Sequence, residues 1–140
     1  MMNISTRGRY AARVMVLLAS SPDGSLTKHE IARAEDITPA YVQQLMMALR
    51  LAGLVRSVRG RLGGFVLARP PEQISVADVL AAVEGNIMPA PCRVATHCDR
   101  FDACPTRPLW ERAASMLQEL FSGTTIADLA RENAPDCTGS

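Results

Sequence analysis

The chain has 140 residues, a length that suits one domain with an additional arm. Hydrophobic residues make up 48% of it, which excludes wholesale disorder, and aromatic residues make up only 4%, which argues against a large aromatic-lined substrate pocket. The net charge of +1 is unevenly divided: residues 1–70 hold ten Lys or Arg against four Asp or Glu, whereas residues 71–140 hold five against ten. The basic first half therefore favours contact with a polyanion through that half alone.

The sequence predicts no membrane span and no export signal. The longest uncharged run, residues 37–49, is too short and too polar to cross a bilayer. Three arginines precede an apolar stretch at residues 14–19, but that stretch is too short for a signal peptide. We therefore expect a cytoplasmic protein that does not associate with membranes. Its four cysteines are then reduced and available for metal or redox chemistry.

Helices are predicted at the start of the chain and again after its first loop. Apolar residues at helical spacing predict a first helix that ends near residue 19 and is capped by Ser5 or Thr6. Thr27 and Glu30 have the spacing of a capping box and predict the start of a second helix. The residues of this helix expected to face the core are Ile31 and Ala34.

A third helix and a hairpin are predicted next. The helix should begin at Pro39, behind the capping hydroxyl of Thr38, and end near Gly53. Two β-prone runs, residues 54–59 and 65–68, flank a glycine-rich turn and predict a β-hairpin. The helix has an apolar face that packs and an opposite face that is free to contact something else. The apolar face consists of Val42, Leu45, Met46 and Leu49, and the opposite face of Ala40, Gln43, Gln44, Met47 and Arg50.

The rest of the chain divides into a short helix, an irregular segment and two further helices. Ser75 and Asp78 predict the start of the short helix. Periodicity disappears over residues 86–107, where three prolines exclude a long helix. A strong helix follows, and Thr124 or Thr125 caps a short last one. The apolar stripe of the strong helix consists of Leu109, Ala113, Met116, Leu117, Leu120 and Phe121.

This order predicts a mainly α fold with a small β-hairpin wing, namely a winged helix-turn-helix followed by a long helix. The third helix fits the major groove of DNA, where Gln pairs with adenine and hydroxyls hold phosphate. Glycines at the hairpin tip let the backbone approach DNA, and Arg suits a narrow minor groove. A solvated polar face is one alternative, and a nucleotide cradle is another, although the turn lacks the Gly-x-x-x-x-Gly-Lys pattern. The predicted contacts are Thr38, Tyr41, Gln43 and Gln44 for bases and phosphates, Arg59 and Arg61 for the minor groove, and Arg56 for phosphate.

Three cysteines, Cys92, Cys98 and Cys104, are separated from one another by five residues each. Structural zinc sites usually pair cysteines two to four residues apart, so the wider gaps favour a larger object, and an iron–sulfur cluster is such an object. Spare thiols and a zinc site with His97 as fourth ligand are the alternatives.

Several segments match one family of proteins in the right order. They are residues 5–11, 37–45, 53–60, 63–67 and 74–76, followed by the three cysteines and by Leu109 and Trp110. On these segments the chain resembles the Rrf family of bacterial winged-helix regulators, whose cluster-binding members include the IscR-like, NsrR-like and RirA-like proteins. The resemblance extends from residue 2 to about residue 131.

The resemblance implies a homodimer and a [2Fe–2S] or [4Fe–4S] cluster whose state alters DNA binding. It divides the chain into a DNA-binding domain at residues 1–85, a cluster-binding cysteine loop at 86–107, and a dimerisation helix, short last helix and tail at 108–140. IscR-like members complete the site with a His three residues after the last Cys, where this chain has Arg107, which is no ligand. NsrR-like members use a carboxylate near a place where this chain has Arg9. The fourth ligand is left open among His97, which is favoured, Asp99, Asp102, Cys137 and an external ligand.

We therefore expect a DNA-binding transcriptional regulator, with repression as the favoured output, whose DNA affinity is set by a cluster that senses iron, redox or nitric oxide state. One alternative is a metal-free thiol/disulfide switch repressor, and another is a cluster carrier or electron-transfer protein that does not bind DNA. The expected partners are a double-stranded DNA operator and a second copy of the chain, with no small-molecule substrate. An enzyme is not expected, because the sequence has no paired acid and base and no nucleophile motif.

Overall fold

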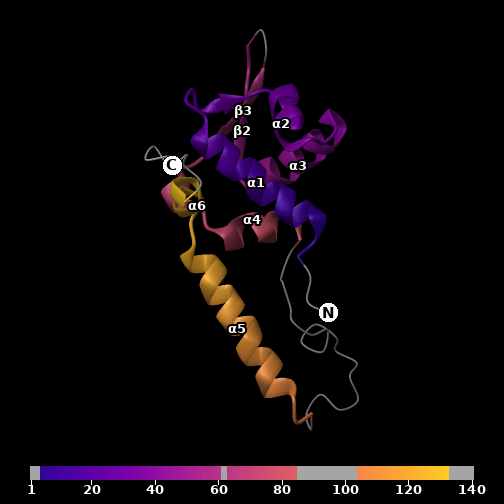
Figure 1. Cartoon of the computed structure of the whole chain (residues 1–140), viewed down its shortest axis with the longest axis vertical. Helices are drawn as coiled ribbons and strands as arrows, with labels where there is room; N and C mark the ends of the chain where they lie inside the picture. The colour runs from indigo at the N-terminus through magenta and orange to yellow at the C-terminus, as the bar shows by residue number, and fades with distance from the viewer. Residues whose placement is uncertain (1–3, 61–62, 85–103, 133–140) are drawn as a thin grey trace, which may run out of the picture.

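A computed structural model describes residues 4–60, 63–84 and 104–132. One helix, α1, crosses a helical unit that carries a small sheet, and another, α5, projects away from that unit (Figure 1). The elements in chain order are α1 (Thr6–Ser20), β1 (Ser25–Leu26), α2 (Lys28–Glu35), α3 (Pro39–Leu51), β2 (Val55–Val58), β3 (Gly64–Leu67), the 3₁₀ turn η1 (Pro71–Gln73), α4 (Val76–Val83), α5 (Arg107–Gly123) and α6 (Ile126–Glu132). The predicted fold class, mainly α with a hairpin wing, is confirmed.

The helices begin where the capping residues predict. The Ser5 hydroxyl accepts a hydrogen bond from the backbone N–H of Gly8 at 3.1 Å, so Ser5 rather than Thr6 caps α1. Thr27 and Glu30 form both bonds of the capping box at 3.1 Å. Each bond satisfies a backbone donor that the helix leaves without an internal acceptor. Gly53, with φ of +77°, follows α3 in the left-handed conformation that glycine adopts without strain.

The predicted hairpin gains a third strand that the sequence does not reveal. Strands β2 and β3 pair in antiparallel fashion, with Ser57 opposite Phe65, and β1 pairs with the other edge of β3, with Leu26 opposite Phe65. The sheet order is therefore β1-β3-β2. Because β1 has only two residues, it is too short to display an alternating pattern, and only its pairing with β3 defines it.

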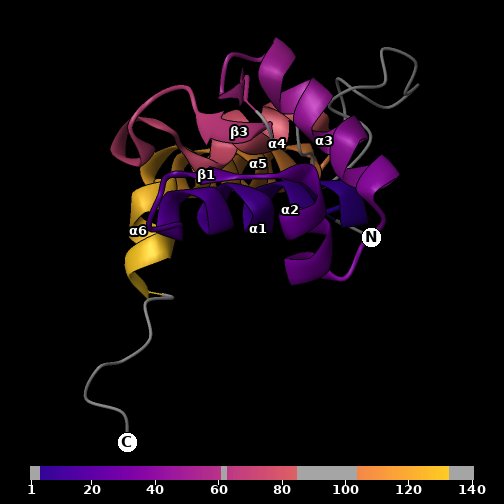
Figure 2. The same cartoon turned by 90° about the horizontal axis from the view of Figure 1, so that it is seen from above.

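The hydrophobic core lies between α1, α2, α3, α4, α6 and the sheet. Figure 2 shows α1 with α2 beside one end and α6 beside the other. All four residues of the predicted apolar face of α3 are fully buried. The largest fully buried side chains are Met15, Leu18, Ile31, Leu45, Met46, Leu49, Leu54, Ile74, Ile126, Val14, Val42 and Val55.

The prediction of which α2 residues face the core is wrong at one position. Ile31 is buried as expected, but Ala34 is exposed and Ala32 is buried in its place. The inner face of α2 also includes Glu35, whose carboxylate pairs with the Arg13 guanidinium at 2.7 Å. The side of α2 that faces the core therefore passes through Ile31, Ala32 and Glu35 and excludes Ala34, and the ion pair satisfies the largely buried Glu35 carboxylate.

Helix α5 leaves most of its surface uncovered in the single chain. Ala114 is its one buried residue, while Leu109, Met116 and Leu120 are 54%, 63% and 60% exposed. After α5 the chain returns to the core, because the Ile126 N–H donates to the Ile74 carbonyl and the Val76 N–H to the Thr124 carbonyl, both at 2.8 Å. In the part of the chain that the structure describes, no helix has the length and apolarity needed to cross a membrane.

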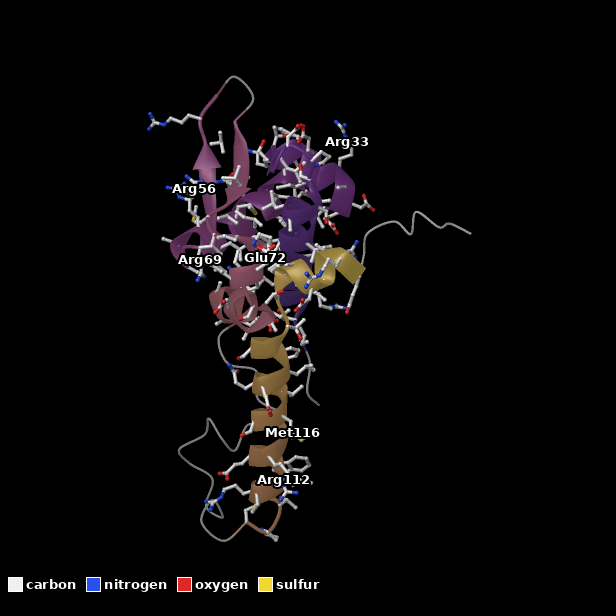
Figure 3. The ribbon with its side chains drawn as sticks, turned by 90° about the vertical axis from the view of Figure 1, so that its left-hand side faces the viewer. Arg33, Arg56, Arg69, Glu72, Arg112 and Met116 are labelled. Carbon is white, nitrogen blue, oxygen red and sulfur yellow. The ribbon has the colours of Figure 1, made fainter. Side chains whose placement is uncertain are left out.

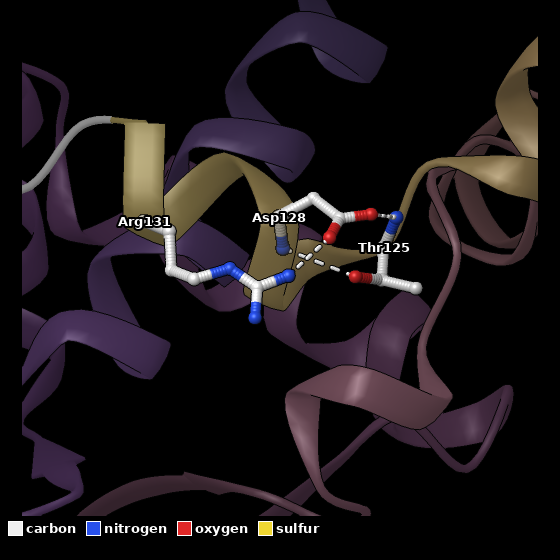
Figure 4. A network of polar contacts seen from close by, with 3 residues as sticks. All are labelled: Thr125, Asp128 and Arg131. Atoms are coloured by element: carbon white, nitrogen blue, oxygen red, sulfur yellow. Dashed lines mark hydrogen bonds and ion pairs between the residues drawn. The ribbon is translucent and has the colours of Figure 1, made fainter.

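Helix α6 begins with a capping box of its own. The Thr125 N–H donates to the Asp128 carboxylate and the Asp128 N–H donates to the Thr125 hydroxyl, both at 3.0 Å, and Arg131 pairs with the same carboxylate (Figure 4). Hydrogen bonding from the Thr125 backbone, followed by the Thr125 side chain and Arg131, holds the pKa of Asp128 below its ordinary value. Thr125, one of the two predicted caps, is therefore the residue that starts α6.

Candidate nucleic-acid interface and cysteine site

The outer face of α3 is built from the residues that the periodicity predicts. Gln43 and Gln44 are exposed, one helical turn from the capped N-terminus of α3, where the Thr38 hydroxyl accepts the Tyr41 N–H at 3.1 Å. The opposite face is locked into the core, so the direction of this polar face is fixed. The face presents amide donors and acceptors next to the positive end of a helix dipole, which suits base edges and phosphates.

Tyr41 is half-buried rather than free. Its ring lies edge-on to that of Tyr10, with 6.0 Å between the ring centroids. The Arg13 guanidinium lies 5.8 Å from the Tyr10 ring centroid on the same α1 surface. The sequence placed Tyr41 on the free face of α3, but this contact with α1 draws the ring toward the core.

The wing presents arginines on the same unit. Arg56 lies on β2 and Arg59 directly after it, and both are exposed. In Figure 3 Arg56 and Arg69 lie toward the wing side of the unit, whereas Arg33 lies on the other side. Arg61 lies outside the described residues. The structure thus describes two of the three predicted wing and strand contacts and leaves both exposed to solvent.

A hydrogen bond that the sequence does not reveal joins α3 to the wing. The Arg50 guanidinium, from the last turn of α3, donates to the Ser57 hydroxyl on β2 at 3.2 Å. Sequence reasoning assigned Arg50 to the free face, and no local pattern indicates a partner across the turn. The bond connects the two elements that the sequence predicts to contact DNA.

Cys104 is the one predicted cluster ligand that the structure describes. Its thiol lies at the surface just before α5, 3.2 Å from the Thr106 hydroxyl, which also accepts the Trp110 indole N–H at 3.2 Å. The hydrogen bond from the Thr106 side chain is the main cause that lowers the pKa of Cys104. The sequence analysis did not single out Thr106. It lies between Cys104 and Arg107, and a threonine is not among the residue types expected to bind the cluster.

The other candidate ligands lie outside the described residues; they are Cys92, His97, Cys98, Asp99, Asp102 and Cys137. Within the described ranges no three metal-ligating side chains come together. Arg107 begins α5, and its guanidinium lies 3.6 Å from the Glu111 carboxylate. It stands three residues after Cys104, where the resemblance predicts a His, and offers no lone pair to a metal.

Comparison with known proteins identifies the family. The model of the Rrf2 family, described as an iron-dependent transcriptional regulator, matches residues 4–132. The transcriptional regulator CymR of Bacillus subtilis is 38% identical over 130 residues, which cover 92% of this chain and 90% of that relative. Its solved structure, described as the global cysteine regulator of B. subtilis, has a TM-score of 0.79 at 35% identity and covers 95% of this chain and 99% of that one.

A second solved structure represents another member of the family. IscR of T. potens has a TM-score of 0.76 at 32% identity, with 94% of this chain and 88% of that one covered. These relatives are transcriptional regulators and not enzymes, in agreement with the sequence prediction. The family match over nearly the whole chain, together with these regulator relatives, shows that this protein is a DNA-binding transcriptional regulator that belongs to the Rrf2 family.

Proposed function

We propose that this chain is a promoter-binding repressor whose residues 1–85 contact DNA. The observation that carries the proposal is the exposed polar face of α3 beside the arginines of the wing, in a member of a family of transcriptional regulators. Gln43, Gln44 and the Thr38 hydroxyl would serve bases or phosphates in the major groove, and Arg59 and Arg61 would enter the minor groove. Arg56 would contact phosphate. A regulator of this kind acts in the cytoplasm, where the DNA lies.

The proposal includes a homodimer formed through residues 108–140. The exposed stripe of α5 supports it, because Leu109, Met116 and Leu120 are each more than half exposed on one chain. A twofold dimer would present two copies of α3 to two half-sites of one DNA duplex. A dimer over a promoter blocks polymerase without further contacts, which favours repression as the output.

We further propose that residues 86–107 hold an iron–sulfur cluster through Cys92, Cys98 and Cys104. Cys104 fits this role, because its thiol lies at the surface and shares a hydrogen bond with Thr106, and hydrogen bonds to sulfur tune cluster potentials. His97 is the favoured fourth ligand, since Arg107 cannot serve. When bound, the cluster supplies a centre that responds to iron, redox or nitric oxide state.

A metal-free thiol switch is the second candidate function. The similarity to CymR favours it, because CymR of Staphylococcus aureus has been solved in an oxidized form, and so does Arg107 at the position where IscR-like members carry a ligand. In this case, reversible disulfides among Cys92, Cys98 and Cys104 would change DNA affinity in place of a cluster.

Cluster content separates the two candidates. Protein purified without oxygen should be brown and contain iron and sulfide in similar amounts, and the iron count should distinguish two-iron from four-iron clusters. A colourless protein that cannot be reconstituted but binds DNA would support the thiol switch.

DNA binding itself is tested by its salt dependence. The affinity of a DNA reader falls with salt by a logarithmic slope of about 0.9 per phosphate neutralised, whereas a cluster carrier shows no such binding. The double change Arg59→Ala and Arg61→Ala should weaken binding and reduce this slope, and unchanged affinity would contradict the assigned role of the wing.

A further inference from the structure

The exposed face of α3 carries an apolar side chain in a position where a solvated helix would carry a polar one. Met47 is 58% exposed, although the opposite face of the same helix is fully buried. It follows Gln43 by four residues and Gln44 by three, so it lies directly above both glutamines on the outer surface. Met47 therefore offers an apolar surface beside two amides to whatever binds this face.

The same face lacks charge over most of its length. From Pro39 to Leu49, α3 contains no Asp, Glu, Lys or Arg, and the first charged residue is Arg50. The Arg50 guanidinium donates to Ser57 on the wing strand, and so it is already engaged within the protein. Guanine is read mainly by Arg or Lys and cytosine by Asp or Glu, so apart from Arg50, which is bonded to Ser57, this face has no side chain of the types that read G·C pairs most strongly.

We propose that Met47 is a specificity residue that packs against the C5 methyl group of thymine, so that α3 reads A·T pairs. Gln43 and Gln44 offer amides for the N6 and N7 atoms of adenine, and Met47 offers an apolar surface for the methyl group that distinguishes thymine in the major groove. This inference rests on the proposed DNA-binding function and names the base pairs that the α3 face selects.

A protein partner is the competing occupant of this surface. Leu51, at the end of α3, is 85% exposed and Val58, on the wing strand, is 40% exposed, so apolar surface also extends away from the glutamines. DNA is favoured for Met47, because Met47 lies one helical turn from both amides. Leu51 is on the same side of α3 but one turn further toward its C-terminal end, and Val58 lies on the wing. Leu51 therefore provides a matched control.

The test uses operators selected from random duplexes by the full-length protein. Each thymine of the selected site is replaced in turn by deoxyuridine, which removes the methyl group and preserves the base pairing. For the unaltered protein, at least one such replacement in each half-site should weaken binding about threefold to tenfold. For Met47→Ala the same replacement should change affinity less than about twofold, while Leu51→Ala should retain the full effect.

The outcomes separate the inference from the function on which it rests. Selection of no sequence would contradict both. A selected operator whose affinity is indifferent to every thymine replacement would overturn the methyl contact and leave DNA binding intact. Full retention of the replacement effect by Met47→Ala, or its transfer to Leu51→Ala, would also overturn the assignment to Met47. Because Met47 is exposed, unchanged thermal unfolding of Met47→Ala confirms that the variant is folded.

Discussion

The exposed stripe of α5 predicts that self-association depends strongly on Leu120. This side chain is 60% exposed in the single chain. Full burial of a leucine side chain is worth about 1.5–3 kcal/mol, so burial of the exposed part against a partner contributes about 1–2 kcal/mol. A twofold interface contains the side chain twice. Leu120→Ala should therefore cost the dimer about 2–4 kcal/mol, which raises the dimer dissociation constant about 30-fold to 700-fold.

The substitution leaves the helix itself intact. Alanine has a higher helix propensity than leucine, and the bond from the Thr124 hydroxyl to the Leu120 carbonyl, at 2.8 Å, involves the backbone of residue 120. Ser115→Ala is the matched control, because Ser115 is exposed on the opposite side of α5 from the stripe. This control should associate like the unaltered protein.

Sedimentation velocity over a series of concentrations measures the association, and circular dichroism confirms that helix content is retained. Loss of the dimer should also lower operator affinity, because a single half-site then has to hold the protein. The reasoning is refuted if the unaltered chain is a monomer at every concentration, or if Leu120→Ala and Ser115→Ala associate equally well.

Three further predictions concern stability. Thr38→Ala removes the hydroxyl that accepts the Tyr41 N–H at 3.1 Å and should lower the free energy of unfolding in urea by about 0.5–2 kcal/mol, whereas Thr38→Ser should restore most of it. Glu84 Oε1 accepts the Ser5 N–H at 2.5 Å, and a Cβ at Gly8 would lie 2.6 Å from that oxygen. Gly8→Ala should therefore disturb this bond and lower stability in the unaltered chain. In a chain that already carries Glu84→Ala, the bond is absent and Gly8→Ala should have less effect. A double-mutant cycle should give a coupling of about 1 kcal/mol, and strictly additive effects would contradict the contact. Because the pKa of Asp128 in the folded protein lies below its ordinary value of 3.8, its stabilising effect is present at neutral pH and is lost as pH falls through the folded pKa. The difference in unfolding free energy between the unaltered chain and Asp128→Ala should therefore shrink when denaturation is measured below about pH 4 rather than at pH 7, and a constant difference would count against the capping role.

Local patterns determined most of the helices and which side of α3 is buried and which is exposed. The Thr27–Glu30 and Ser75–Asp78 boxes both form, and the apolar face of α3 is buried as its spacing predicts. These features depend on residues three or four positions apart, so the chain itself specifies them before any long-range contact forms. The apolar stripe of α5 was also predicted from sequence, because the spacing of its residues is a local pattern, although the single chain leaves the stripe exposed.

The tertiary structure alone decided the contacts between distant segments. Strand β1 exists because β3 pairs with it, and Arg50 reaches Ser57 because α3 and β2 pack against each other. The largely buried Glu35 carboxylate has its ion-pair partner because α1 supplies Arg13, and Ala34 is exposed, against the prediction from sequence. Ser5 and Glu84 are 79 positions apart, and their hydrogen bond depends on α1 packing against α4. Periodicity shows which face of a helix is buried, but the identity of its neighbour follows only from the packing of the whole chain.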